Sequence, residues 1–138
     1  MADEDISKQK TQERALELSF VSAQIKQFEE QLSALAQKEE EVLVIANALE
    51  NIKDLKAGHD IFSQLGAGLY FSTTLKDSSE LLVNVGADVF VKKSIKDAQG
   101  TLLGQRLELQ KIRETIFERI NLLSSKAQEL ERELEKTY

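Results

Sequence analysis

A pair of glycines is the first feature of this sequence that could bind a ligand. Gly66-Ala67-Gly68 has the spacing that opens a phosphate-binding loop, in which glycines let backbone N–H groups approach a phosphate. A dinucleotide-binding fingerprint needs a third glycine at position 71 and a helix directly after it, whereas this chain has Phe71 and strand-like alternation. The glycines therefore indicate a tight hairpin turn that requires positive φ.

The remaining candidates for chemistry are the only histidine, His59, and the run Glu39-Glu40-Glu41. A histidine that activates a nucleophile needs that nucleophile and an orienting acid beside it. His59 instead follows Gly58 in a connection that leaves a long helix, where we expect it to be solvated. Three successive helical residues point in different directions, so the glutamates indicate a solvated face with one acid at the helix seam. We therefore predict no catalytic residue, no metal site and no cofactor, and hence no enzyme.

Composition and charge disfavour several further classes of protein. Of the 138 residues, 41 % are hydrophobic and 30 % are charged, which is typical of a folded chain and not of a disordered one. No stretch approaches the roughly 20 uncharged apolar residues of a membrane span. The net charge of −6, with no basic cluster beyond Lys92-Lys93, disfavours nucleic acid as a partner. The absence of cysteine excludes disulfides and thiolate metal sites and, with the acidic start, favours a cytoplasmic protein.

Two long segments have the heptad spacing of a coiled coil. From about residue 6 to 57 there is no glycine or proline, and residues 94–137 repeat the same apolar spacing. We expect each segment to form one helix. The first heptad ladder contains Val21, Phe28, Leu35, Val42 and Leu49. The second contains Leu102, Leu109, Ile116, Leu123 and Leu130, with Ile112, Ile120, Ala127 and Leu134 between them.

The two ladders can pair if the chain folds back on itself. Seam residues that face each other in an antiparallel pair have residue numbers with a constant sum, and five pairs here add up to 151. These pairs are Val21–Leu130, Phe28–Leu123, Leu35–Ile116, Val42–Leu109 and Leu49–Leu102. The sequence therefore predicts an antiparallel two-helix coiled coil in this register.

Between the helices, residues 61–92 alternate like strands and carry few charges. We predict four strands, at about 61–65, 69–75, 80–85 and 88–92, which form two hairpins. The segment Lys76-Asp77-Ser78-Ser79 has the chemistry of the turn between them, and Ser94 is placed to cap the second helix. The predicted fold class is therefore α+β, with a single domain over residues 1–138.

Isolated hairpins are unstable in water, and their open edges favour pairing with another chain. The hairpins therefore indicate assembly between chains at the base of the coiled coil. The residues that we expect to carry it are Leu69, Phe71, Leu75, Leu81, Val83, Val85, Val89 and Val91.

Several apolar residues are not used by the helical seam. Leu16 and Phe20 lie off the first heptad stripe, and Leu122 lies off the second. In the predicted register these three residues fall on the outer half of the arms, with Ile6 and Tyr138 at the extreme ends. Scattered exposed apolar residues are normal in proteins, and a contact surface for another protein is the alternative.

The central segment resembles the alpha class of the prefoldin family, in its archaeal form. The resemblance rests on three motifs. They are Leu65-Gly66-Ala67-Gly68-Leu69-Tyr70, Leu75-Lys76-Asp77 and Leu82-Val83-Asn84-Val85-Gly86-Ala87-Asp88-Val89-Phe90-Val91-Lys92-Lys93-Ser94. Their position between two heptad arms extends the resemblance over essentially the whole chain. The chain departs from the family pattern by having Gln64 and Ser72 or Thr73 near the family's prolines, and Asp88 at a turn glycine.

The resemblance implies a subunit of an ATP-independent chaperone that holds unfolded polypeptide. Family members form a hexamer of two alpha and four beta-type subunits, whose hairpins join into a β-barrel body. The ends of the coiled coils bind unfolded chains and deliver them to a group II chaperonin. On this basis we expect the client contacts to be Ile6, Leu16, Phe20, Leu122, Leu130, Leu134 and Tyr138. The alternative is a structural coiled-coil scaffold that binds one defined protein partner along its arm.

Overall fold

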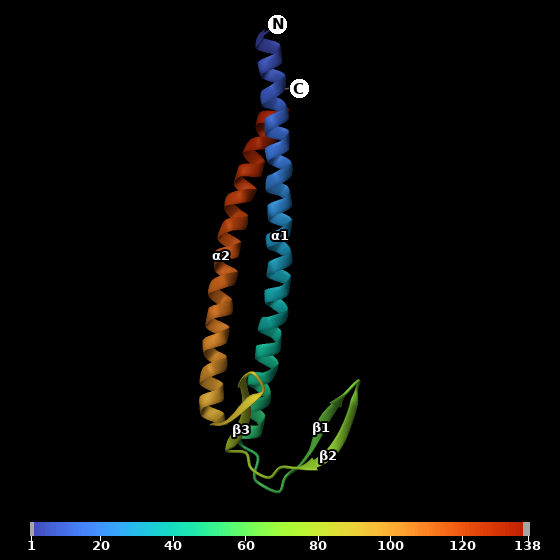
Figure 1. Cartoon of the computed structure of the whole chain (residues 1–138), viewed down its shortest axis with the longest axis vertical. Coiled ribbons are helices and arrows are strands. Elements are labelled where there is room, and N and C mark those ends of the chain that lie inside the picture. Colours follow the sequence, from blue (N-terminus) through green and yellow to red (C-terminus); the bar gives the residue numbers. More distant parts are fainter. Residues whose placement is uncertain (1, 137–138) are drawn as a thin grey trace. The chain divides into compact units, whose positions relative to one another are not determined.

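The computed structural model describes residues 2–136, which form two long helices connected by two β-hairpins (Figure 1). The elements in order are α1 (Ala2–Lys53), β1 (Asp60–Gly66), β2 (Leu69–Thr74), β3 (Glu80–Gly86), β4 (Val89–Ser94) and α2 (Ile95–Glu135). The predicted α+β fold of two long helices and two hairpins is confirmed. The chain divides into two compact units, Met1–Lys38 with Glu108–Tyr138 and Glu39–Leu107, which we describe separately. A single domain over the whole chain stays a prediction.

The first unit is an antiparallel pair of helical segments from α1 and α2. Its interior consists of seam residues at heptad spacing, with Val21 and Leu35 buried on α1 and Ile116 and Leu130 buried on α2. Both members of two predicted pairs are thus removed from water, which is what the predicted register requires. The salt bridge of Arg14 with Glu133 confirms the antiparallel direction, because it joins the start of one helix to the end of the other.

One predicted seam position is wrong. Ile112 is 47 % exposed, and the half-buried residue between Leu109 and Ile116 is Arg113. From Leu109 onward the residues that are at least half-buried, Ser124 apart, alternate steps of four and three, and Arg113 fits that alternation whereas Ile112 does not. An arginine can occupy such a position because its methylene stem packs against apolar neighbours while the guanidinium reaches water.

The second unit has a small apolar cluster that joins helix ends to a hairpin. Leu49 of α1 is buried with Ile95 and Ala98 of α2, and Leu81 of β3 packs against them together with Leu102. Leu49 and Leu102 are another predicted seam pair, so the register is supported here as well. The expected cap of α2 is present, since the Asp97 backbone N–H donates to Ser94 Oγ at 3.1 Å.

The two hairpins have the same construction. β1 pairs with β2 and β3 pairs with β4, both antiparallel, and each pairing has an irregularity just before its turn, at Gln64/Gly66 and Asn84/Gly86. The turns are two residues long, and both turn residues have positive φ in each hairpin. That backbone is typical of the tight hairpin turn that the glycines predict.

The observed ends of the elements differ from the predicted ones by a few residues. α1 ends at Lys53 and not at residue 57, and the connection turns at Gly58, which has a φ of 88°. β4 begins at Val89 because Asp88 lies in the turn, with a φ of 58°. Leu75 lies just beyond β2, but its backbone still bonds to the connection: its N–H donates to the His59 carbonyl at 2.8 Å.

Candidate interaction surfaces

Both hairpins carry exposed apolar side chains that the chain itself does not cover. Of the residues predicted to carry assembly, Leu69, Phe71, Val85, Val89 and Val91 are exposed. The other three, Leu75, Leu81 and Val83, are half-buried. Leu81 packs partly against the cluster around Leu49, so only the rest of its side chain is accessible to a second chain. The role of the whole set in assembly stays a prediction.

A second set of exposed apolar residues on the hairpins was not among the predicted assembly residues. These are Phe62, Leu65, Tyr70, Leu82 and Phe90. Phe62 pairs with Ser72, and Asn84 with Phe90, so Phe62 and Phe90 lie on the faces opposite to Phe71 and Val83. Unbroken apolar runs such as Leu69-Tyr70-Phe71 could have predicted this second set. Strands that are buried on both faces have continuous rather than alternating hydrophobicity.

The strand edges of the first hairpin are open as well as apolar. Each hairpin is a separate two-stranded sheet, so each strand has one edge with unpaired backbone groups among the described elements. Natural edges are usually protected by charged residues, above all lysine. Within β1 and β2 the only charged residue is Asp60 at the start of β1. This hairpin therefore has the physical properties of a surface that another chain covers.

A second candidate surface lies on α1 in the first unit. Leu16 is 73 % exposed and Phe20 is 63 % exposed, and they line an open groove with Glu13, Glu17, Ser19 and Ala23. Residues four apart share a helix face, so Leu16 and Phe20 form one apolar patch. Leu18, three residues before the buried Val21, is half-buried in the seam, and Phe20 lies two residues, or about 200°, around the helix from it. The patch therefore faces away from α2.

A further apolar groove in the same unit involves both helices. Gln24 and Phe28 of α1 line it together with Arg119, Leu122 and Leu123 of α2. Leu122 is 72 % exposed, the second largest exposed fraction among the large apolar residues that the structure describes in this unit. Phe28 and Leu123 are also a predicted seam pair. The first unit thus presents two apolar grooves, one on α1 alone and one across the helix pair.

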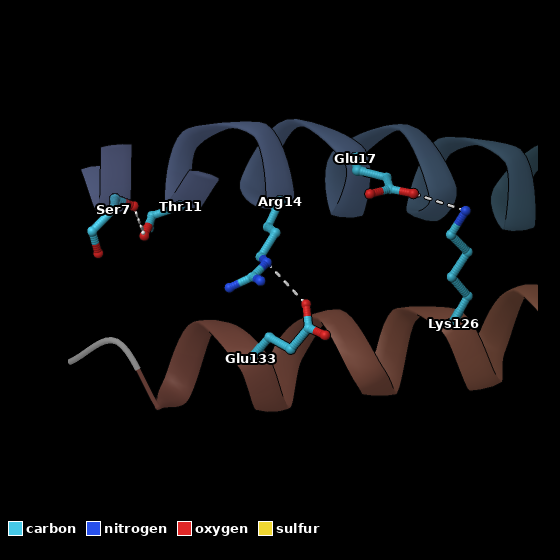
Figure 2. A network of polar contacts seen from close by, with 6 residues as sticks. All are labelled: Ser7, Thr11, Arg14, Glu17, Lys126 and Glu133. Atoms are coloured by element: carbon cyan, nitrogen blue, oxygen red, sulfur yellow. Dashed lines mark hydrogen bonds and ion pairs between the residues drawn. The ribbon is translucent and has the colours of Figure 1, made fainter. Parts of the chain in front are cut away.

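Two salt bridges join the helices beside these grooves (Figure 2). Arg14 Nε lies 3.0 Å from Glu133 Oε2, and Lys126 Nζ lies 2.7 Å from Glu17 Oε1. Nearby, Thr11 Oγ1 donates to the Ser7 carbonyl at 2.9 Å within α1. All four charged side chains are well exposed, so each bridge contributes about 0.2–1 kcal/mol. Both bridges are compatible with the antiparallel pairing that the buried seam residues stabilise.

The predicted client contacts fall into three groups. Ile6, Leu16, Phe20 and Leu122 are exposed, as a contact surface requires. Leu130 is only 6 % exposed and Leu134 is half-buried, because both pack in the seam. As long as α2 stays paired with α1, Leu130 is not exposed to a client, so a client contact at Leu130 or Leu134 requires the helix ends to fray and stays a prediction. Tyr138 lies outside the described residues.

The shifted pKa values in the second unit have structural causes. The Ser79 hydroxyl and backbone N–H both donate to Asp77 Oδ1, at 2.7 and 2.8 Å, and these bonds lower the pKa of Asp77. A hydrogen bond from Lys53 at 3.0 Å lowers the pKa of Glu50 in the same way. Both carboxylates stabilise a local turn or helix end.

The described part of the chain offers no metal-binding cluster and no membrane-spanning helix. Within residues 2–136, no group of three or more His, Asp or Glu side chains is placed to hold a metal ion. None of the helices in that range is both long enough and apolar enough to cross a membrane.

Comparison with known proteins gives consistent matches along nearly the whole chain. The family model for prefoldin, described as prefoldin subunit, matches residues 7–138. The prefoldin subunit alpha of Methanoculleus marisnigri is 30 % identical over 123 residues, which cover 88 % of this chain and 80 % of that protein. The prefoldin subunit alpha of Methanococcus vannielii is 26 % identical over 125 residues, covering 91 % and 84 %.

A solved structure has a similar fold. The cryo-EM structure of filamentous PFD from Methanocaldococcus jannaschii superposes with a TM-score of 0.73. The match covers 84 % of this chain and 96 % of that one, at 17 % sequence identity. The likeness therefore concerns the arrangement of helices and hairpins.

Proposed function

This chain belongs to the prefoldin family, as an archaeal alpha-class chaperone subunit, and we propose that it holds unfolded polypeptide without using ATP. The observation that carries this proposal is the set of exposed apolar side chains on otherwise charged helices. Leu16, Phe20 and Leu122 are each more than 60 % exposed and line two open grooves. A non-native chain exposes apolar side chains of its own, and burying the two surfaces against each other is favourable.

The proposed mode of holding is many weak contacts acting together. One groove with two or three apolar side chains binds weakly, and it imposes little sequence preference because apolar contact is not directional. If several copies of such grooves belong to one assembly, a client bound at one groove meets the next at a high effective concentration. Holding and release then follow from binding equilibria, and no chemical step is needed.

We further propose that the hairpins assemble the subunit with beta-type prefoldin subunits, in a hexamer of two alpha and four beta chains with a β-barrel body. The support is the open, nearly uncharged edge of the first hairpin and the apolar side chains on both faces. Such a surface is unstable in water alone and is covered when strands of a neighbouring chain pair with it. The proposed setting is the cytoplasm, with delivery of the client to a group II chaperonin.

Truncation tests this function against the structural scaffold. Removing about three heptads from both ends of the chain deletes Leu16, Phe20 and Leu122 while leaving the hairpins intact. A chaperone should then lose suppression of client aggregation and keep its oligomeric mass. If the trimmed assembly still protects an unfolded client as well as the full chain, the client-binding proposal is wrong. A scaffold would instead retain one stoichiometric partner and show no protection with either form.

A further inference from the structure

The groove around Leu16 and Phe20 is bordered by carboxylates. Glu13 and Glu17 line it, and no basic residue does. We propose that this groove selects segments of non-native polypeptide in which apolar residues are flanked by lysine or arginine. This inference rests on the proposed holding function and adds a substrate class to it.

The geometry places both carboxylates next to the apolar patch. Glu13, Glu17 and Phe20 follow one another at steps of four and three, so they lie along one side of α1. A client side chain that packs on Phe20 therefore brings its neighbouring residues within reach of a carboxylate. Asp3, Glu4 and Asp5 in the first turn of α1 add negative charge toward the same end of the helix.

The two carboxylates are not equally available. Among residues 2–136, Glu13 forms no salt bridge, so its charge is open to a cation from outside. Glu17 is bound to Lys126 of α2 at 2.7 Å, and a client cation has to compete with that lysine (Figure 2). Glu13 thus contributes more to the selection, and removing the Lys126 charge should strengthen it.

Apolar burial and charge have different roles in this groove. Burial of Leu16 and Phe20 supplies most of the affinity and is the same for any apolar segment. Exposed charges add little affinity but discriminate between partners, since attraction to a lysine and repulsion of a glutamate act in opposite directions. The second groove contains Arg119 and no carboxylate, so the preference belongs to the α1 groove.

Fluorescently labelled peptides with one apolar core and three kinds of flank test this inference. The flanks are lysine, glutamine or glutamate, and the protein is the full chain in its assembled form, followed by fluorescence anisotropy. At low salt we expect lysine flanks to bind about threefold more tightly than glutamine flanks, and glutamate flanks about threefold more weakly. At about 1 M salt, where the screening length falls to about 3 Å, the three peptides should bind nearly alike.

Four variants locate the effect. Glu13→Gln with Glu17→Gln should remove the preference, and Lys126→Gln should increase it. Glu29→Gln with Glu30→Gln is the matched control, because it removes the same charge from exposed positions of α1 outside the groove and should leave the preference intact. Leu16→Ala with Phe20→Ala should weaken the binding of all three peptides and reduce the differences between their affinities. Helical content by circular dichroism verifies that each variant is folded.

The outcomes separate this inference from the holding function. If the glutamine-flanked peptide binds through Leu16 and Phe20 but flank charge has no effect, the holding function stands and the charge selection is wrong. The selection is also wrong if both charge-removing pairs reduce the preference equally, since the cause is then the overall charge. If no peptide binds the assembled protein, both proposals are overturned.

Discussion

Ala67 and Ala87 hold equivalent places in the two hairpins, each as the first residue of a two-residue turn, with a φ of 51° and 50° respectively. Each follows a glycine of positive φ at the irregularity in its strand pairing. A side chain with a Cβ costs about 1–2 kcal/mol in this left-handed region. The two hairpins are therefore built on the same strained turn, twenty residues apart.

Replacing either alanine by asparagine should relieve this strain. Asparagine tolerates positive φ and is the preferred first residue of such turns, so Ala67→Asn and Ala87→Asn should each raise the free energy of unfolding by about 0.5–1 kcal/mol. Urea denaturation followed by circular dichroism measures the change. The same substitution at the exposed helical residue Ala34 should instead lower stability by about 0.5 kcal/mol. A loss of stability at both turns would contradict the assigned strain.

Assembly should depend on the hairpin faces that carry Phe62 and Phe90. Phe62 is 77 % exposed and Phe90 is also exposed, so replacing both with serine should cost the isolated chain little stability. In an oligomer these rings are expected to be buried, and their loss should shift the native mass toward smaller species. Native mass spectrometry with a beta-type partner measures this, and Leu16→Ser with Phe20→Ser serves as the control that keeps the oligomer. An unchanged mass for the hairpin variant would remove these faces from the interface.

The helices and hairpins could be predicted because their signals are local. Heptad spacing, the absence of glycine before Gly58 and the turn residues each follow from the sequence within a few positions. Ile112 was misplaced because an apolar residue was preferred to a charged one. The seven-residue spacing of Leu134, Ala127 and Ile120 leads back to Arg113, which is the position that the structure half-buries.

The client and assembly surfaces were harder to predict, because the exposure of a side chain depends on which other elements pack over it. Leu130 and Leu122 are both apolar residues near the end of α2, yet one is buried in the seam and the other is exposed. On the hairpins, alternation selected one face of each strand, while the apolar residues on the opposite faces, such as Phe62, were missed. The binding of a client at the grooves and assembly through the hairpins stay predictions.

The turn between the hairpins should make stability depend on pH at acidic values. The hydrogen bonds from Ser79 lower the pKa of Asp77 in the folded chain. The Asp77 carboxylate therefore stabilises the folded chain to its full extent at pH values above the unfolded-state pKa. The effect is lost as the pH falls through the lower, folded-state pKa.

Asp77→Asn isolates this contribution, because the amide oxygen still accepts the bonds from Ser79 but carries no charge. The variant should be less stable than the wild type near neutral pH, and the difference should vanish in strong acid. Urea midpoints measured from pH 6 to pH 2.5 follow the difference, and the other carboxyl groups cancel because both proteins share them. A difference that is constant over this range would show that the charge of Asp77 does not contribute.

Substitutions at Leu122 and Leu130 distinguish a role in client binding from a role in helix packing. Leu130→Ala leaves a cavity in the seam and should lower the free energy of unfolding by about 2–4 kcal/mol. Leu122→Ala removes a side chain that is 72 % exposed, so it should change stability by less than about 0.5 kcal/mol while weakening the suppression of client aggregation. Denaturation curves and light scattering of an aggregating client, measured well below the unfolding transition of both variants, distinguish the two effects. If Leu130→Ala alone impaired protection under those conditions, the client would be bound by an opened seam and not by the exposed groove.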